Sequence, residues 1–407
     1  MNSNFSSSHF QRILVLLAIV SIPLYIYRLQ FGFFVTNIWE VFFYIICILF
    51  LCTLAVKKEL IHYIRSISQN KITRYLLLYA LIFIPAIIRA NDVFSGLGFV
   101  KAYLIDPALL VFLLWYNFKS QYASYIKAFI LSSLLVVIIG FINLVVFKGE
   151  SRLLSLFPSA NFVSLYIVPV VPLYFLIRAQ IDNKYRVVAD VAMGVIVLGV
   201  LLTLSRSGII ALGCFGLYLA WQRLRFNNKR TITIAVCVGT ALVFTLGPLV
   251  YAHFFADRGV SSDAVRLYLY KDTWTIMTQH TLNSLFGIGL GNFQSIYTQF
   301  STFDIVRTLY VVPHAVTPHN VLLNIWVEFG MIGVLYFIWL GIDISMNLRK
   351  KILTDTTASF IAWGFVLILI QGLFEATILK NDLGLYFWFL VLLAIMYITK
   401  SGEIKAL

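Results

Sequence analysis

Long apolar stretches recur along the whole chain, and short polar connections separate them. A helix needs about 20 predominantly apolar residues to cross the hydrocarbon core of a membrane. The pattern therefore predicts an all-α polytopic membrane protein with about 12 transmembrane helices, folded as a single integral-membrane domain over residues 1–407. The predicted spans lie near residues 13–29, 38–56, 75–89, 100–118, 126–147, 160–179, 187–205, 207–222, 231–253, 319–341, 358–379 and 383–399.

The composition supports this class. Only 12% of the 407 residues are charged and 61% are hydrophobic, whereas soluble globular domains carry about 25% charged residues. The formal net charge of +14 comes from short basic runs at the ends of the predicted helices, where anionic lipid headgroups account for them. Membrane lipids are therefore expected as partners, and nucleic acid is not.

Basic residues also predict the orientation, because cytoplasmic loops hold an excess of Lys and Arg. With a cytoplasmic N-terminus, 20 of the 31 basic residues fall on the cytoplasmic side, which predicts that both termini are cytoplasmic and the number of spans is even. The cytoplasmic set comprises Arg12, Lys57, Lys58, Arg65, Lys71, Arg74, Lys119, Lys127, Arg178, Lys184, Arg186, Arg223, Arg225, Lys229, Arg230, Arg349, Lys350, Lys351, Lys400 and Lys405.

Residues 255–317 form one long connection, which the charge count places outside the membrane between the ninth and tenth predicted spans. The connection contains a helical pattern at 261–277 and a glycine turn, GIGLGNF, at 287–293. Connections of this length are uncommon without a function. We expect a large, mainly helical extracytoplasmic loop that folds as a cap over the external helix ends.

The segment TPHNVLLNIWVEFG (317–330) places polar residues at the mouth of an apolar helix. Thr317 as the N-cap and Pro318 at the first helical position predict that the helix begins there. His319 would then lie in the first turn, where the helix dipole favours the neutral ring, and a neutral histidine can act as a general base. The alternative is a histidine that only caps the helix or meets lipid headgroups.

Further polar residues follow on the same helix. Asn320, Asn324 and Glu328 are spaced by four, so they share one face. Ionisable groups inside a span usually face the bundle interior or a water-filled cavity. Glu328 is therefore expected either to orient a ligand or to join an interhelical network. Glu375 lies near the external end of its own predicted span, where it is placed to reach the same cavity.

Two arginines are candidates for an anion site, since the guanidinium fork suits phosphate and pyrophosphate. Arg206, in LTLSRSG (202–208), is predicted to end the seventh span and has no acidic neighbour in sequence. Arg266 belongs to the helical pattern of the external loop. The alternatives are snorkelling to lipid phosphates for Arg206 and a local pair with Asp263 for Arg266.

Other patterns indicate less specific roles. Gly289 and Gly291 in GIGLGNF lack the ending and the context of a nucleotide-binding loop, which favours a tight turn with close backbone approach. His314 and His319 are five positions apart without an HExxH pattern, and the four cysteines show neither zinc nor disulfide spacing. Neither a metal nor another cofactor is expected.

Three pieces stand in one order along the chain: LTLSRSG, then DAVRLYLYKDTW with LFGIGLGNF, then PHNVLLNIWVEFGMIG. Together they resemble the O-antigen ligase and polymerase superfamily of bacterial integral-membrane glycosyltransferases. The predicted span count, topology and loop position agree with that superfamily over nearly the whole chain. The resemblance implies an enzyme of the bacterial cytoplasmic (inner) membrane whose active site faces the periplasm or the outside.

The resemblance also implies a metal-independent, inverting transfer of a glycan from undecaprenyl pyrophosphate to an acceptor hydroxyl. By that analogy Arg206 and Arg266 would hold the pyrophosphate, and His319 would take the proton from the acceptor. The assignment of the base depends on matching the HN pair, because His314 lies so close. The supporting residues would be Asn320, Glu328, His314, Gly289 and Gly291.

The acceptor separates two activities of the superfamily. A ligase moves the finished glycan to a lipid A-core sugar, whereas a polymerase adds it to a second lipid-linked glycan, as in O-antigen or exopolysaccharide synthesis. The placement of the SR, R and HN residues favours a ligase, although GIGLGNF also occurs in polymerase-like members. A transporter of lipid-linked oligosaccharides is a more distant alternative, because the sequence shows no inverted repeat of the kind typical of transporters.

Overall fold

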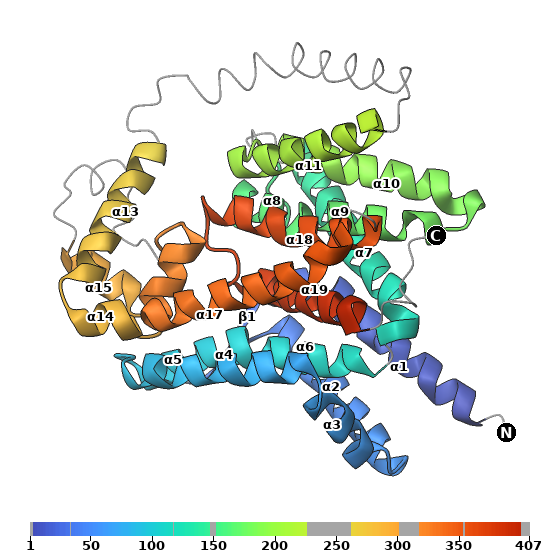
Figure 1. Ribbon diagram of the computed structural model, residues 1–407, viewed down its shortest axis with the longest axis horizontal. Helices are drawn as coiled ribbons and strands as arrows, with labels where there is room; N and C mark the ends of the chain where they lie inside the picture. Colours follow the sequence, from blue (N-terminus) through green and yellow to red (C-terminus); the bar gives the residue numbers. More distant parts are fainter. Residues whose placement is uncertain are drawn as a thin grey trace.

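The computed structural model describes residues 3–32, 34–116, 118–146, 152–225, 262–300, 317–352 and 355–399. This part of the chain is mainly helical, and most of its helices run along the long axis of the molecule (Figure 1). Its elements are α1 (Ser3–Val20), η1 (Ile22–Ile26), β1 (Arg28–Phe31), β2 (Phe34–Asn37), α2 (Ile38–Val56), α3 (Leu60–Ser68), α4 (Lys71–Ile88), α5 (Val93–Val100), η2 (Lys101–Ile105), α6 (Asp106–Trp115), α7 (Phe118–Val146), α8 (Ala160–Ile167), α9 (Val170–Ile177), η3 (Arg178–Gln180), α10 (Asn183–Leu202), α11 (Arg206–Arg225), α13 (Ser262–Thr278), α14 (Thr281–Phe286), α15 (Phe293–Phe300), α17 (Val321–Ile352), α18 (Thr356–Gly372) and α19 (Asn381–Thr399).

Within the described residues, eight helices are long and apolar enough to cross a membrane, judged by length and composition. Gln11–Val20 and Thr356–Gly372 are shorter apolar helices. The predicted span at 231–253 lies outside the described residues. The helical class is therefore confirmed, while the count of twelve spans and the single domain over the whole chain remain predictions.

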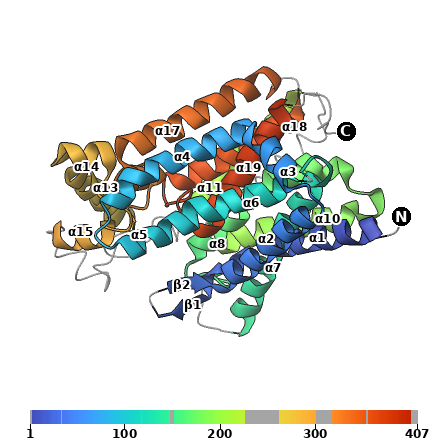
Figure 2. The same ribbon diagram turned by 90° about the horizontal axis from the view of Figure 1, so that it is seen from below.

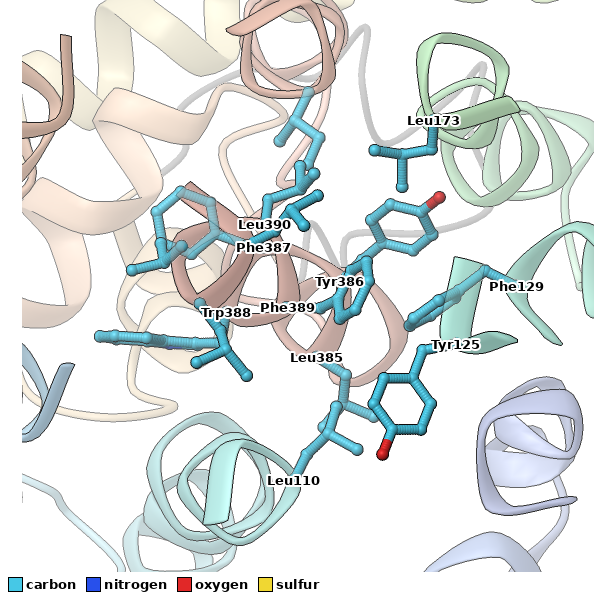
Figure 3. Close-up of a cluster of buried hydrophobic side chains, with 14 of the residues drawn as sticks. Leu110, Tyr125, Phe129, Leu173, Leu385, Tyr386, Phe387, Trp388, Phe389 and Leu390 are labelled. Atoms are coloured by element: carbon cyan, nitrogen blue, oxygen red, sulfur yellow. The ribbon is translucent and has the colours of Figure 1, made fainter. Parts of the chain in front are cut away.

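α19 lies in the interior of the bundle and packs against α4, α6, α17 and α18. All of its residues from 382 to 397 are buried. Figure 3 shows Leu110 of α6, Phe129 of α7 and Leu173 of α9 gathered around Tyr386 and its neighbours. A helix that is apolar on every side is suited to the interior of a bundle, which explains why α19 occupies this position.

The all-α prediction is wrong at residues 28–37, where β1 and β2 form an antiparallel hairpin. The predicted first span, 13–29, ends as a helix at Val20. Pro23 lies in the first turn of the 3-10 helix that follows, and proline lacks the N–H that a continuing α-helix would need. Gly32 closes the hairpin with φ of +60°, a conformation that glycine adopts without a Cβ penalty.

The helices α13, α14 and α15 lie together at one end of the bundle in both views (Figures 1 and 2). α13 and α15 share an apolar core with α17, to which Leu269, Met277 and Phe293 contribute together with Trp326 and Val327. α14 also packs against α17. The described part of the predicted 255–317 loop is thus largely helical and packs on the start of α17. Its position outside the membrane stays a prediction.

Candidate functional site

Glu375 is the centre of a polar cluster in the connection between α18 and α19. Its side chain is almost fully buried, with 5% of its area exposed. One carboxylate oxygen, Oε2, lies 2.7 Å from Nδ1 of His319, and the other, Oε1, lies 3.2 Å from Nη2 of Arg266. The structure therefore brings the predicted base and one predicted anion-binding arginine to the same carboxylate.

His319 lies just before α17 and not inside its first turn, which corrects the expected helix start. Its φ is +50°, in the left-handed region. The side-chain oxygen of Asn320 accepts hydrogen bonds from the N–H groups of Leu322 at 3.0 Å and Leu323 at 3.2 Å. Asn320 is therefore the N-cap in place of Thr317, in keeping with the stronger capping preference of asparagine.

Hydrogen bonds to the backbone fix the position of this cluster. The hydroxyl of Tyr270, in α13, lies 3.1 Å from the carbonyl oxygens of both His319 and Leu373 and can donate to either. The side-chain amide of Asn320 donates to the same Leu373 carbonyl at 3.1 Å. The external-loop helix α13, the start of α17 and the α18–α19 connection are thereby joined at one point.

Two polar residues of this network went unrecognised in the sequence. The amide of Asn161, in the first turn of α8, donates to Oε1 of Glu375 at 3.3 Å. Arg152 donates through Nη2 to Oδ1 of Asn161 at 2.9 Å and through Nε to the carbonyl of Thr203 at 2.8 Å. No motif marks either residue, because what they do depends on partners that lie far away in the chain.

Glu375 and Lys380 share the α18–α19 connection, and burial acts on both. Burial alone would raise the pKa of Glu375, but His319 and Arg266 more than offset it, so the pKa of this carboxyl lies below its ordinary value. Burial lowers the pKa of Lys380, against the opposing effects of Asp382 and Glu375. The Lys380 ammonium lies 3.7 Å from the Asp382 carboxylate.

The protonation of the His319 ring follows from its partner. An ionised Glu375 has no proton to give, so Nδ1 carries the proton in this contact. In the neutral ring the lone pair then belongs to Nε2. His319 keeps 37% of its side chain exposed, so a ligand can reach it. The arrangement is that of a carboxylate-oriented histidine that can accept a proton at Nε2.

Arg206 is the first residue of α11, which corrects the expectation that it ends the preceding span. α10 already ends at Leu202, and the turn that follows contains Thr203, whose carbonyl oxygen accepts the hydrogen bond from Arg152. α11 also packs against α8, the helix that carries Asn161. The start of α11 therefore lies beside the network that leads to Glu375.

The glycine turn and Glu328 form a structural clamp. Gly289 has φ of +96°, and a Cβ added there would lie 2.2 Å from the carbonyl oxygen of Arg89. Arg89 in turn donates through Nε to the carbonyl of Gly287 at 2.8 Å. The carboxylate of Glu328 accepts a hydrogen bond from the N–H of Gly291 at 2.9 Å. Gly289 and Gly291 thus have the positive φ of a tight turn, and Glu328 contacts this turn.

The other predicted polar residues differ in where they lie. Asn324 is buried in α17. His314 lies outside the described residues, as does the side chain of Asp263. Among the described histidines, His319 is the one that contacts Glu375. Arg266 contacts the carboxylate of Glu375 at 3.2 Å, a partner that the predicted local pair with Asp263 did not include.

The chain was compared with curated proteins and with models of protein families. No curated protein matches the chain. Residues 191–338 match the model of a family described as O-antigen ligase. This segment contains Arg206, Arg266, the glycine turn and His319, whereas Glu375, Asn161 and Arg152 lie outside it. The match over residues 191–338 confirms the resemblance of the chain to the O-antigen ligase and polymerase superfamily.

Proposed function

We propose that the protein is an O-antigen ligase-like glycosyltransferase. It would move a glycan from undecaprenyl pyrophosphate to a hydroxyl of a lipid A-core sugar on the periplasmic face of the inner membrane. The observation that carries the proposal is the contact of Glu375 with both His319 and Arg266, at 2.7 Å and 3.2 Å. One carboxylate there joins a candidate base to a candidate anion-binding group.

The proposed reaction uses the two parts of the cluster separately. Nε2 of His319 takes the proton from the acceptor hydroxyl as the acceptor oxygen bonds to the anomeric carbon. The bond between that carbon and the pyrophosphate oxygen breaks, and the configuration inverts. Arg266 and Arg206 offset the negative charge that grows on the leaving pyrophosphate, which is an electrostatic contribution to catalysis. No metal is assigned a step in this proposal.

Transfer by the purified full-length protein tests the proposal. Undecaprenyl-pyrophosphate glycan is supplied with and without a lipid A-core acceptor, and products are read on glycan gels. Product that requires the core supports the ligase. A ladder that forms without the core would show a polymerase of the same superfamily. Absence of transfer with competent substrates would overturn both and favour a lipid-linked oligosaccharide transporter.

His319→Ala tests the base within the same assay. We expect transfer to fall by about 10²–10⁴-fold, the usual contribution of a general base. His280→Ala is the matched control, because His280 is exposed and makes no side-chain capping bond at the start of α14. Equal activity of the two variants would remove His319 from the reaction, provided that both proteins elute as folded species.

A further inference from the structure

Glu375 divides its two oxygens between two kinds of partner. Oε2 contacts the His319 ring, whereas Oε1 receives the Arg266 guanidinium and the Asn161 amide. The side chains of Glu375 and Arg266 are 5% and 17% exposed, so little water competes for these contacts. Whatever removes Arg266 from Oε1 therefore changes how strongly the carboxylate holds His319.

The charged groups around His319 and Glu375 come from several elements. α13 supplies Arg266, and the α18–α19 connection supplies Lys380, whose charge is matched by Asp382 at the start of α19. The segment before α8 supplies Arg152, which is joined to Glu375 through the neutral Asn161. The neutral Asn320, which follows His319 in the chain, bonds to the backbone of Leu373, Leu322 and Leu323, and Arg206 begins α11. A second carboxylate in contact with the ring is not found among the described residues.

The Glu375 carboxylate faces two partners, Arg266 and the His319 ring. When His319 is neutral, Arg266 and Glu375 compensate each other, and the pair carries no net charge. When His319 is protonated, the same three residues carry one net positive charge. An anion that binds Arg266 must therefore bind more tightly to the protonated cluster, since it meets that additional charge in a poorly hydrated site.

We propose that Glu375 is a positioning residue that links diphosphate binding to proton retention at His319, because Arg266 exchanges its contact with Glu375 for one with the diphosphate. The inference rests on the proposed function, since it takes the donor diphosphate as the ligand of Arg266. With Arg266 turned to the phosphate oxygens, Oε2 of Glu375 holds the imidazolium more firmly. Asn161 remains as the neutral donor to Oε1 and keeps the carboxylate in place.

Coupling between diphosphate binding and the proton on His319 affects product release. The acceptor proton passes to Nε2 of His319 while the bond from the anomeric carbon to the pyrophosphate oxygen breaks. The product state then holds an imidazolium, a carboxylate and a pyrophosphate anion together. Binding linkage is reciprocal, so loss of the proton weakens diphosphate binding by the same factor by which diphosphate strengthens proton binding. Deprotonation of His319 to solvent thereby favours product release.

Proton uptake on binding inorganic pyrophosphate tests the link without requiring catalysis. The full-length protein in detergent is titrated near neutral pH in two buffers that differ in ionisation enthalpy, and the difference in heat gives the number of protons exchanged. His319→Ala reports the exchange that belongs to pyrophosphate itself. We expect the wild type to take up more protons than His319→Ala, and we expect Glu375→Gln to lose this histidine-dependent uptake while still binding the anion.

Glu59→Gln is the matched control, because this glutamate contacts the Tyr116 hydroxyl at the start of α3, in another part of the molecule. We expect its proton uptake to equal that of the wild type. Glu375→Asp serves as a second variant in case Glu375→Gln does not elute as a folded protein. It keeps the charge but shortens the side chain by one methylene, so the contact with Nδ1 and the uptake should both be lost.

Three outcomes overturn the inference: no binding of pyrophosphate to the wild type, equal uptake in the wild type and His319→Ala, or undiminished uptake in the Glu375 variants. The last outcome would mean that the anion acts on His319 directly. The inference and the proposed function fail separately. Glycan transfer that depends on His319 without linked proton uptake removes only the inference, whereas linked uptake without any transfer removes the function.

Discussion

At the scale of single residues, the charge of Glu375 depends on its partners. Burial opposes ionisation, and His319 and Arg266 reverse that effect, so the pKa of the Glu375 carboxyl falls below its value in the unfolded chain. A carboxyl whose pKa is lower in the folded state stabilises the fold above its unfolded pKa. That stabilisation disappears as the pH falls through the folded pKa. The cluster should therefore loosen in acid.

Glu375→Gln tests whether the ionised carboxyl stabilises the fold. Near neutral pH the variant leaves Arg266 without its carboxylate, and removing one partner of a buried ion pair costs at most about 3–5 kcal/mol. We expect thermal unfolding at a lower temperature than in the wild type at neutral pH, with the difference shrinking below the ordinary range of glutamate, about pH 4. A difference that stays constant between neutral and acid pH would contradict the ionised assignment.

Some residues of this cluster could be predicted from the sequence and others could not. His319 and Arg266 could be predicted, because a polar residue at the mouth of an apolar helix and an arginine in a long loop stand out from their surroundings. Glu375 was placed near them for the same reason. Asn161 could not be predicted, since it is an ordinary residue of a helix start whose partner lies 214 positions away.

At the scale of elements, α17 contains a break that depends on glycine. Gly330 has φ of +70° inside the helix, and a Cβ there would lie 2.2 Å from the carbonyl oxygen of Leu285 in α14. Gly289 similarly faces the carbonyl of Arg89 at the end of α4. Backbone meets backbone at both positions, so no side chain can move aside. The clamp joins the loop helix α14 to α4 and α17.

Gly289→Ala is expected to weaken the clamp. A non-glycine residue in a sparsely populated backbone region costs about 1–3 kcal/mol, and the clash with Arg89 adds to this strain. Gly194→Ala is the control, because Gly194 lies inside α10 and a Cβ there meets nothing within 4 Å. Alanine there should be neutral or stabilising by up to about 1 kcal/mol. Equal unfolding temperatures for the two variants would disprove the clamp.

Elements were predictable where length and polarity agree. The predicted span at 38–56 coincides with α2, because an uninterrupted apolar run leaves few alternatives. The hairpin at 28–37 was missed, since residues 28 and 29 were assigned to the first span and residues 30–37 to the connection after it. The start of α17 was set too early because Thr317 and Pro318 imitate a helix start, while Asn320 makes the capping bonds.

At the scale of the whole molecule, five segments that are distant in sequence meet around Glu375. They are the α7–α8 connection, the α10–α11 turn, α13, the start of α17 and the α18–α19 connection. The charge count assigns every one of them to the external side. A wrong alternation of spans would place some of them on opposite faces, so the cluster fits the predicted alternation. An inverted molecule would keep them together on the other side, so the orientation itself stays a prediction from charge.

Cysteine labelling in intact cells checks that orientation. The four native cysteines are replaced by serine, and single cysteines are introduced at two exposed positions, Gln69 before α4 and Gln279 after α13. We expect a membrane-impermeant maleimide to label Gln279→Cys directly and Gln69→Cys only after permeabilisation. The reverse pattern would invert the molecule and place the cluster on the cytoplasmic side.

The burial of α19 also bears on how the protein is made. Every helix that α19 packs against precedes it in the chain, yet 89% of its apolar window is buried among them. Helices emerge from the ribosome in sequence order, so the earlier ones must remain parted, or separate again, until α19 enters. Glu375 and Lys380 arrive just ahead of it. The polar cluster is therefore completed only once the α18–α19 connection has emerged, and a chain halted before that point carries His319 and Arg266 without the carboxylate that unites them.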